Sequence, residues 1–339
     1  MGKIFAGMFL SFSVLLIIHI IFLGINIYLW ITEGLESLLQ ERNFVETIYF
    51  SILLKWLILA DIIWASFALG FALKRKKYKT EPQHYLSYEP IKHPIIAVII
   101  PTFNEAVNVE KVVKDYKMQP NVKYVYVIDN NSSDKTPDIA EKCGAVVIRK
   151  KINKGGFGDS CVVGFNEVLK TDANIVALTE CDGTFNAYDI TKMIPYLDNC
   201  DMVVGTRIIQ VLTEKGNQNG MFHTWGNFFI GKLIQLKYFS LLHMGVTSFT
   251  DVGCGYRCIR RDGLEKIIGQ IRNDYLNKIG KDGWMFNPYI TLCSVDNELK
   301  TVEIPITFNR RSGISKSGSD EKSKGFKLGL RMIWLILSS

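Results

Sequence analysis

Two long apolar stretches near the start of the chain limit its fold more than any other feature. Ile4–Ile31 is almost uninterrupted apolar sequence, and Thr47–Leu73 is a second such stretch, which includes Lys55 and Asp61. Each is longer than the roughly 20 residues that a helix needs to cross the hydrocarbon core of a bilayer. A secretory signal is the rival interpretation of the first stretch, but its apolar core is too long and no small-residue cleavage site follows. We therefore predict two transmembrane helices, over about residues 4–31 and 47–73.

The charges around these stretches predict the orientation of the pair. Thr32–Glu46, expected to be a short loop, holds four glutamates and one arginine, whereas five of the six residues in Lys74–Lys79 are basic. Basic flanks stay on the cytoplasmic side, so both ends of the hairpin are expected there. The net charge of +7 clusters beside apolar sequence, which favours an anionic membrane surface over nucleic acid. Seven cysteines without a C-x-x-C pair indicate a reducing compartment.

Beyond a proline-containing linker at 80–94, the pattern changes to apolar runs that alternate with helical stretches. This alternation predicts an α/β domain with a doubly wound, mostly parallel sheet over residues 95–317. Residues 318–339 form a basic tail, in which Phe326–Leu337 is too short to span a bilayer and is expected to be an interfacial amphipathic helix. The expected strands are Ile95–Ile100, Val122–Ile128, Ala145–Ile148, Asn174–Thr179, Asp201–Thr206 and Thr301–Pro305, and the expected helices are Glu105–Lys117, Gly155–Leu169, Trp225–Leu242 and Gly263–Ile271.

The segment Val176–Phe185 begins as an apolar run, which ends in a pair of acidic residues followed by a glycine. Glu180 and Asp182 are two positions apart, so at a strand end both carboxylates point to the same side. Such a pair can hold a hard divalent cation together with substrate phosphates. The alternative is an acidic turn that caps a helix near Asp189. Other polar turns follow the expected strands at Pro101–Glu105 and Asp129–Asp134, and ligands bind beyond the carboxyl ends of strands in such sheets.

Taken together, these motifs resemble a known family. The P-x-x-N-E at Pro101–Glu105, the Asp129 turn ending in S-S-D-K-T, the E-x-D at Glu180–Asp182 and the sequence Gly205–Arg207 are similar to inverting, nucleotide-sugar-dependent GT-A glycosyltransferases of family 2. Within that group the chain most resembles dolichyl- or polyprenyl-phosphate sugar synthases. Asp251–Arg257 and the R-x-G-x-S-K that begins at Arg311 extend the resemblance, which covers roughly Ile95–Ser317.

The resemblance implies a role for individual residues, with Mg²⁺ or Mn²⁺ as cofactor. It assigns nucleotide-sugar binding to Pro101, Asn104, Glu105, Asp129, Asn130, Lys154 and Glu180; metal binding to Glu180 and Asp182; acceptor-phosphate binding to Arg207, Arg257, Arg311 and Lys316; and catalytic roles to Asp182, Arg207 and Asp251. Whether Glu180 binds the metal or the ribose is left open, as is whether Asp251 orients an acceptor or caps a turn.

The sequence departs from the pattern of the family in three places: the E-x-D, the turn at Asn130 and Asn131, and the helix before the last strand. Glu180 stands where an aspartate is usual, Asn130 where a second aspartate is common, and Asn131 where glycine is usual. Asparagine tolerates the left-handed conformation, so we expect this turn to form. In the helix before the last strand, Phe286–Pro288 lacks the acidic residue that relatives often carry.

The resemblance implies a multi-pass membrane enzyme whose catalytic domain is cytoplasmic and which acts in glycan or glycoprotein assembly. It would move a sugar from a UDP- or GDP-linked donor to a dolichyl or undecaprenyl phosphate. A lipid phosphate is already a nucleophile near neutral pH, so catalysis would rest on positioning and on cations that screen the phosphates.

Two alternatives remain open. One is transfer to a lipid hydroxyl such as a diacylglycerol, which needs a general base, and the other is a non-catalytic nucleotide-binding scaffold. A processive polysaccharide synthase is disfavoured because no Q-x-x-R-W follows the acidic motifs. The sugar, the nucleotide and self-association of the chain are left open.

Overall fold

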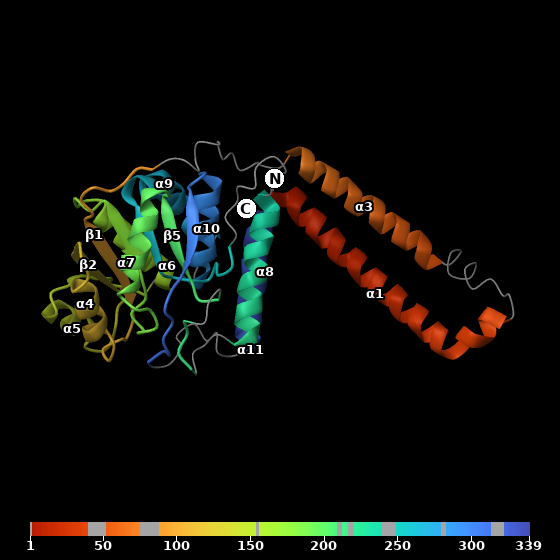
Figure 1. Ribbon diagram of the computed structural model, residues 1–339, viewed down its shortest axis with the longest axis horizontal. Helices are drawn as coiled ribbons and strands as arrows, with labels where there is room; N and C mark the ends of the chain where they lie inside the picture. The colour runs from red at the N-terminus through yellow and green to blue at the C-terminus, as the bar shows by residue number, and fades with distance from the viewer. Residues whose placement is uncertain are drawn as a thin grey trace. The chain divides into compact units, whose positions relative to one another are not determined.

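The computed structural model describes residues 2–39, 52–74, 88–153, 156–208, 212–215, 220–238, 249–278, 283–312 and 322–339. The chain divides into two compact units, one formed by Met1–Lys76 with Ile336–Ser339 and the other by Lys77–Leu335. Figure 1 labels many of the helices and strands of both. Most of the basic run after the second apolar stretch, and most of the linker, lie outside the described residues.

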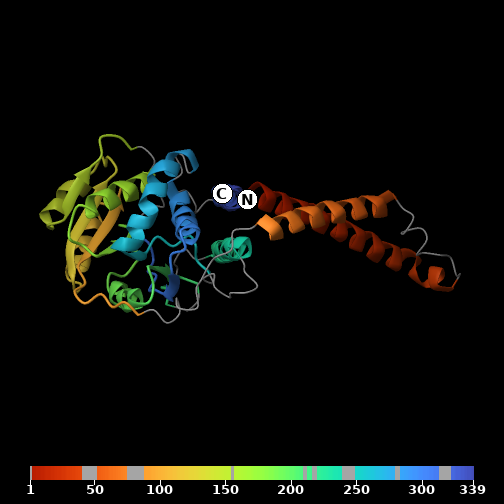
Figure 2. The ribbon, with the colours of Figure 1, turned by 90° about the horizontal axis from the view of Figure 1, so that it is seen from above.

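The first unit contains two antiparallel helices, α1 (Gly2–Leu39) and α3 (Ile52–Lys74). The ring of Phe5 lies 4.9 Å from that of Phe71, and the ring of Phe12 lies 6.0 Å from that of Trp64. The start of α1 therefore packs beside the end of α3 (Figure 2). By length and composition alone, Lys3–Ile25 and Lys55–Lys74 could each cross a membrane.

Many apolar side chains of these helices, such as Ile20 and Leu23 (both 59% exposed), face outward. A lipid environment would cover them. The predicted loop at Thr32–Glu46 needs a correction, because α1 continues as a helix to Leu39. Residues 40–50 lie outside the described part of the chain.

The second unit is built on a seven-stranded sheet with the order β3-β2-β1-β4-β6-β5-β7. β6 is antiparallel to β4 and β5, and the remaining neighbours are parallel. The strands are β1 (Ile96–Thr102), β2 (Val122–Asp129), β3 (Val146–Arg149), β4 (Ile175–Leu178), β5 (Met202–Thr206), β6 (Arg257–Arg260) and β7 (Thr301–Pro305). The predicted α/β class with a mostly parallel sheet is confirmed, and so are the six predicted strands.

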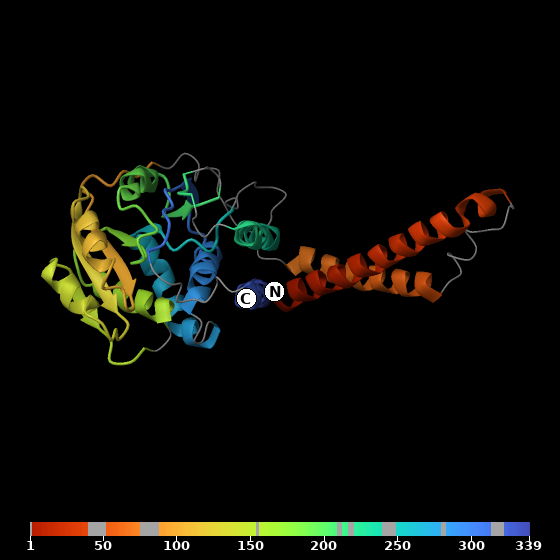
Figure 3. The same ribbon diagram turned by 90° about the horizontal axis from the view of Figure 1, so that it is seen from below.

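The helices of this unit are α4 (Val109–Lys117), α5 (Thr136–Lys142), α6 (Gly156–Val168), α7 (Asp189–Met193), α8 (Met221–Tyr238), α9 (Arg261–Lys278), α10 (Phe286–Asp296) and α11 (Lys322–Ser338), whose last residues belong to the first unit. Several of them contact the sheet: α4, α5 and α6 pack against β2, α7 against β5 and α9 against β6. α4 packs with α5 over β2, and α6 packs with α9 and α10. Figure 3 shows α9 and α10 side by side. Right-handed crossovers place helices on opposite faces when the chain reverses its direction along the sheet, as it does after β3.

Helix α4 confirms one predicted apolar stripe and corrects its start. Val109, Val112, Val113 and Tyr116 are all buried, as their helical spacing predicts. The helix begins at Val109 instead of Glu105. The backbone N–H of Glu105 donates to Thr136 Oγ1. That bond holds the chain in a turn at the end of β1.

Helix α11 covers the C-terminal segment that was predicted to be amphipathic. Phe326, Leu330 and Trp334 follow one another at intervals of four residues, and each is exposed by half or more. Residues four apart lie on one helix face, so these three form an exposed apolar stripe. Its placement at a membrane interface stays a prediction.

Candidate active site

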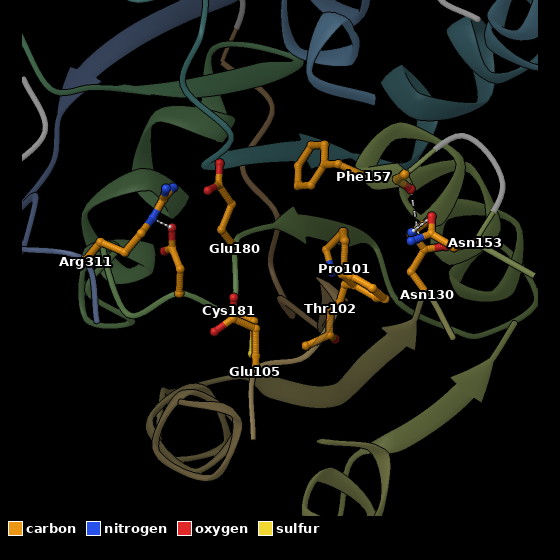
Figure 4. Close-up of a pocket in the computed structure, with 13 residues that line it drawn as sticks. Pro101, Thr102, Glu105, Asn130, Asn153, Phe157, Glu180, Cys181 and Arg311 are labelled. Carbon is orange, nitrogen blue, oxygen red and sulfur yellow. Dashed lines mark hydrogen bonds and ion pairs between the residues drawn. The ribbon is translucent and has the colours of Figure 1, made fainter. Parts of the chain in front are cut away.

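A pocket opens where the parallel strands β2, β1 and β4 end side by side (Figure 4). The turns after these strands, the start of α6 and the segment after β7 supply its walls. The lining residues are Pro101, Thr102, Phe103, Glu105, Asn130, Asn153, Gly156, Phe157, Ser160, Glu180, Cys181, Asp182 and Arg311. The structure thus brings together, at one edge of the sheet, the turns that the sequence placed there.

Asp182 occupies the end of the pocket beside β4 and is almost fully buried. Its Oδ1 accepts hydrogen bonds from the backbone N–H of Thr184 (3.0 Å) and from Thr184 Oγ1 (2.6 Å). Its Oδ2 accepts one from Arg311 Nε at 2.7 Å. The charge of Arg311 therefore neutralises the carboxylate, although the two residues are 129 positions apart in the chain.

Glu180 lies beside Asp182 without a comparable partner. Within the described part of the chain, no hydrogen bond or ion pair reaches its carboxylate. Burial, followed by the charge of Asp182, raises the pKa of Glu180 to about 8, and the charges of Arg311 and Arg207 oppose this shift. Burial therefore favours the protonated form of Glu180, whereas a bound cation would favour its carboxylate form.

Glycine at position 255 makes room for this carboxylate. A Cβ atom added to Gly255 would lie only 2.5 Å from Glu180 Oε1. Gly255 belongs to the D-V-G-C-G-Y-R motif, so the motif supplies the space in which Glu180 sits.

The two carboxylates suit a divalent cation that shares its ligands with a phosphate. Among the described residues, no group of three or more His, Cys, Asp or Glu side chains could hold a metal ion by itself. Mg²⁺ is commonly held by one or two carboxylates, with water and substrate phosphates completing its shell. The carboxylates of Glu180 and Asp182, side by side in the pocket, fit that donor set.

Arg207 and Asp251 form a two-pronged ion pair near this end of the pocket. Arg207 Nε donates to Asp251 Oδ2 at 2.6 Å and Arg207 Nη2 donates to Oδ1 at 2.7 Å. Asp251 is fully buried, and Arg207 keeps 17% of its side chain exposed. Glu303 on β7 accepts hydrogen bonds from the backbone N–H groups of Thr250 and Asp251. Asp251 thereby fixes the direction of a guanidinium whose charge reaches Glu180.

At the opposite end of the pocket, beside β2, the residues are amides. Asn130 Nδ2 donates to Asn153 Oδ1 at 2.6 Å, and Asn130 Oδ1 accepts from Lys150 Nζ at 2.7 Å. Lys150 also forms an ion pair with Asp159. Asn130 is buried, whereas Asn153 is exposed.

Two residues that were predicted to bind the nucleotide have structural contacts and do not line the pocket. Asp129 is fully buried, accepts from the backbone N–H of Ser132 and pairs with Arg149. Asn104 (φ 52°) accepts from the backbone N–H of Ser133 at 2.8 Å, which joins the turns after β1 and β2. Asn131 has φ 63°, so the expected left-handed asparagine in this turn is confirmed.

Arg257 also lies away from the pocket. Its side chain is fully buried, and its guanidinium donates to the backbone oxygens of Val252, Cys254 and Asn287 and to Thr291 Oγ1. Burial lowers the pKa of Arg257 to about 10. We therefore leave Arg257 out of the acceptor site and assign it the support of the loop before β6. Lys154 and Lys316 lie outside the described residues.

No site role was predicted from the sequence for Asn153, Phe157 or Glu303. Phe157 was visible within the glycine-rich start of α6, but its type alone gives no reason to place it in a pocket. Glu303 could have been noticed as a charge inside the short strand T-V-E-I-P, where a buried partner is needed. Asn153 carries no such signal.

The comparisons with known proteins agree with this geometry. The model of the glycosyl transferase family 2 domain matches residues 97–268. The polyprenol monophosphomannose synthase of Mycolicibacterium smegmatis is 28% identical over 240 residues, which cover 68% of this chain and 84% of that protein. The undecaprenyl-phosphate mannosyltransferase of Micrococcus luteus is 25% identical over 228 residues, which cover 65% of this chain and 86% of that protein.

Among solved structures, the glucosyl-3-phosphoglycerate synthase of Mycobacterium tuberculosis in complex with phosphoglyceric acid is similar at a TM-score of 0.46 and 14% identity. The match covers 70% of this chain and 79% of that chain. A likeness at this level says nothing about substrates.

Proposed function

Because this chain belongs to glycosyl transferase family 2, we propose that it transfers a sugar from a nucleotide-sugar to a polyprenyl phosphate at a membrane surface. The main support is the convergence of Glu180, Asp182 and Arg311 in one pocket at the carboxyl edge of the sheet. The names of the two relatives support a polyprenyl phosphate as the acceptor class.

Glu180 and Asp182 would hold Mg²⁺ or Mn²⁺, which supplies positive charge to the donor diphosphate and so stabilises it as a leaving group. Arg311 lies against Asp182 Oδ2, where its guanidinium can contact the same diphosphate. Arginine suits this task because its planar donors match phosphate oxygens.

The acceptor phosphate needs positive charge more than it needs a base. A phosphate monoester with a second pKa near 6 is largely dianionic at neutral pH, so its oxygen can attack the sugar without losing a proton. We assign Arg207 to this acceptor, with Asp251 as the residue that orients it. Both carboxylate oxygens of Asp251 are bonded to Arg207, which disfavours Asp251 as the general base that a lipid hydroxyl would require.

The apolar segments would bring the site to its lipid substrate. Helices α1 and α3 include two stretches that could cross a bilayer, and α11 carries an exposed apolar stripe. With the basic run at Lys74–Lys79 on the cytoplasmic side, the catalytic unit would work at the cytoplasmic face, where a polyprenyl phosphate presents its headgroup.

The variant Gly255→Ala tests whether Glu180 binds the metal. The new methyl group would meet the tip of a flexible side chain, so we expect the carboxylate to move while the fold stays intact. The Mn²⁺ concentration for half-maximal activity should rise about tenfold, a typical loss when a residue that supports a metal site is changed. An altered KM for the nucleotide-sugar with unchanged Mn²⁺ dependence would assign Glu180 to the ribose instead. Gly269→Ala, where a Cβ meets nothing within 4 Å, is the matched control.

A substrate panel tests the proposed function itself. The full-length chain, purified in detergent with Mn²⁺, is incubated with labelled UDP- and GDP-sugars and with dolichyl phosphate, undecaprenyl phosphate or diacylglycerol. We expect label in the organic phase only with a phosphate acceptor. If label appears in the organic phase only with diacylglycerol, the acceptor is a lipid hydroxyl and not a phosphate. Nucleotide binding without sugar transfer to any acceptor would support a non-catalytic scaffold.

A further inference from the structure

We infer that the pocket selects a uracil nucleotide over a guanine nucleotide, through the amide pair Asn130 and Asn153. This inference rests on the proposed function, because that function places the donor diphosphate at Glu180 and Asp182. In the sheet β1 separates β2, which Asn130 follows directly, from β4, which ends two residues before Glu180. Figure 4 shows Pro101 and Thr102 between the two ends. A diphosphate at the acidic end therefore leaves the amide end for the base.

The orientation of the Asn130 amide follows from its partners. Lys150 Nζ carries only donors, so the atom that it contacts at 2.7 Å must be the amide oxygen. The nitrogen then donates to Asn153 at 2.6 Å, which identifies the contacted Asn153 atom as its oxygen. One lysine thus sets the direction of both amides, and the ion pair with Asp159 holds that lysine in place.

This end of the pocket offers more donors than acceptors. Each of the two amide oxygens already accepts one hydrogen bond, and within the described residues no partner takes Asn153 Nδ2. An N–H group that approached Asn130 Oδ1 would also meet the positive charge of Lys150. The hydroxyl of Thr102 donates to the backbone oxygen of Ile100, so it can serve a ligand only as an acceptor.

This pattern matches one base better than another. The hydrogen-bonding edge of uracil has two ring carbonyls and one N–H, which suits amide donors with a single hydroxyl acceptor. The edge of guanine has one carbonyl, one ring N–H and an amino group, so in this wall its extra donors would lack partners. Sites that hydrogen-bond a ligand in a matched pattern bind less tightly to ligands that leave polar groups unpaired.

The test compares UDP with GDP by isothermal titration calorimetry on the full-length chain in detergent with Mn²⁺. We expect UDP to bind at least about tenfold more tightly, which corresponds to about one hydrogen bond. Asn153→Asp keeps the oxygen that Asn130 contacts and replaces the free donor by an acceptor, so it should lower the preference for UDP by about tenfold. The negative charge that Asn153→Asp adds should weaken the binding of both diphosphates equally. The ratio of the UDP and GDP affinities is therefore unaffected by that charge.

Asn121→Asp is the matched control, because it makes the same change in an exposed residue directly before β2, at the end of that strand opposite the pocket. It should leave the ratio unchanged. GDP binding as tightly as UDP, or an unchanged ratio in Asn153→Asp, would overturn the inference and leave the proposed function standing. Binding of neither nucleotide would overturn the donor site and with it the proposed function.

Discussion

Asp182→Asn should abolish sugar transfer, with kcat lowered at least about a thousandfold, as when a group that stabilises transition-state charge is lost. The asparagine keeps the shape of the side chain and an oxygen that can accept from Thr184. It removes the negative charge that would bind a divalent cation and that now pairs with Arg311. The folded state should therefore persist while the chemistry fails.

Asp172→Asn provides the control for this experiment. Asp172 is half-exposed and pairs with Lys123 on the surface, and it does not line the pocket. Rates of label transfer to the organic phase, measured beside a thermal unfolding curve for each variant, separate a catalytic loss from a folding loss. Transfer by Asp182→Asn at even a tenth of the original rate would remove Asp182 from the metal site.

The second large effect is expected at the ion pair. Arg207→Ala should lower kcat by about 100-fold or more, because it removes the cation assigned to the acceptor phosphate. Asp251→Asn should lower kcat as well, because the buried carboxylate sets the direction of the guanidinium through two short hydrogen bonds. Since Asp251 acts through Arg207 in this account, the double variant should be no slower than Arg207→Ala alone.

A double-mutant cycle measures this dependence directly. Rates for the two single variants and the double variant, at saturating donor and acceptor, give the coupling between the residues. A general base would behave differently, because its loss would slow the reaction by the same factor whether or not Arg207 is present. Additive effects would therefore favour a hydroxyl acceptor with Asp251 as the base.

The strands that position the pocket were predictable because their sequence signal is local. Runs such as Ile95–Ile100 are continuous and β-branched, as strands buried on both faces must be, and polar turn residues mark their ends. β6 was missed because it is only four residues long and begins and ends with arginine. It is a strand because its two neighbours bury it, which no local pattern reveals.

The site was predictable to the level of the turns but not of every residue. Glu180 and Asp182 stand out in the sequence because two charges follow an apolar run. Asp129 and Arg257 stand out equally as charged residues in motifs, yet burial turns both toward neighbouring backbone atoms. The pairing of Asn130 with Asn153 depends on contact between segments 23 residues apart, so it required the folded chain.

The acid lability of the lipid product tests the central claim most directly. Wild-type protein with Mn²⁺, labelled nucleotide-sugar and undecaprenyl phosphate should yield an organic-phase product, and mild acid should release the sugar because a glycosyl phosphate is the bond formed. Asp182→Asn should yield none of this product. A product that resists mild acid, or one that forms equally well without a phosphate on the lipid, would contradict transfer to a lipid phosphate.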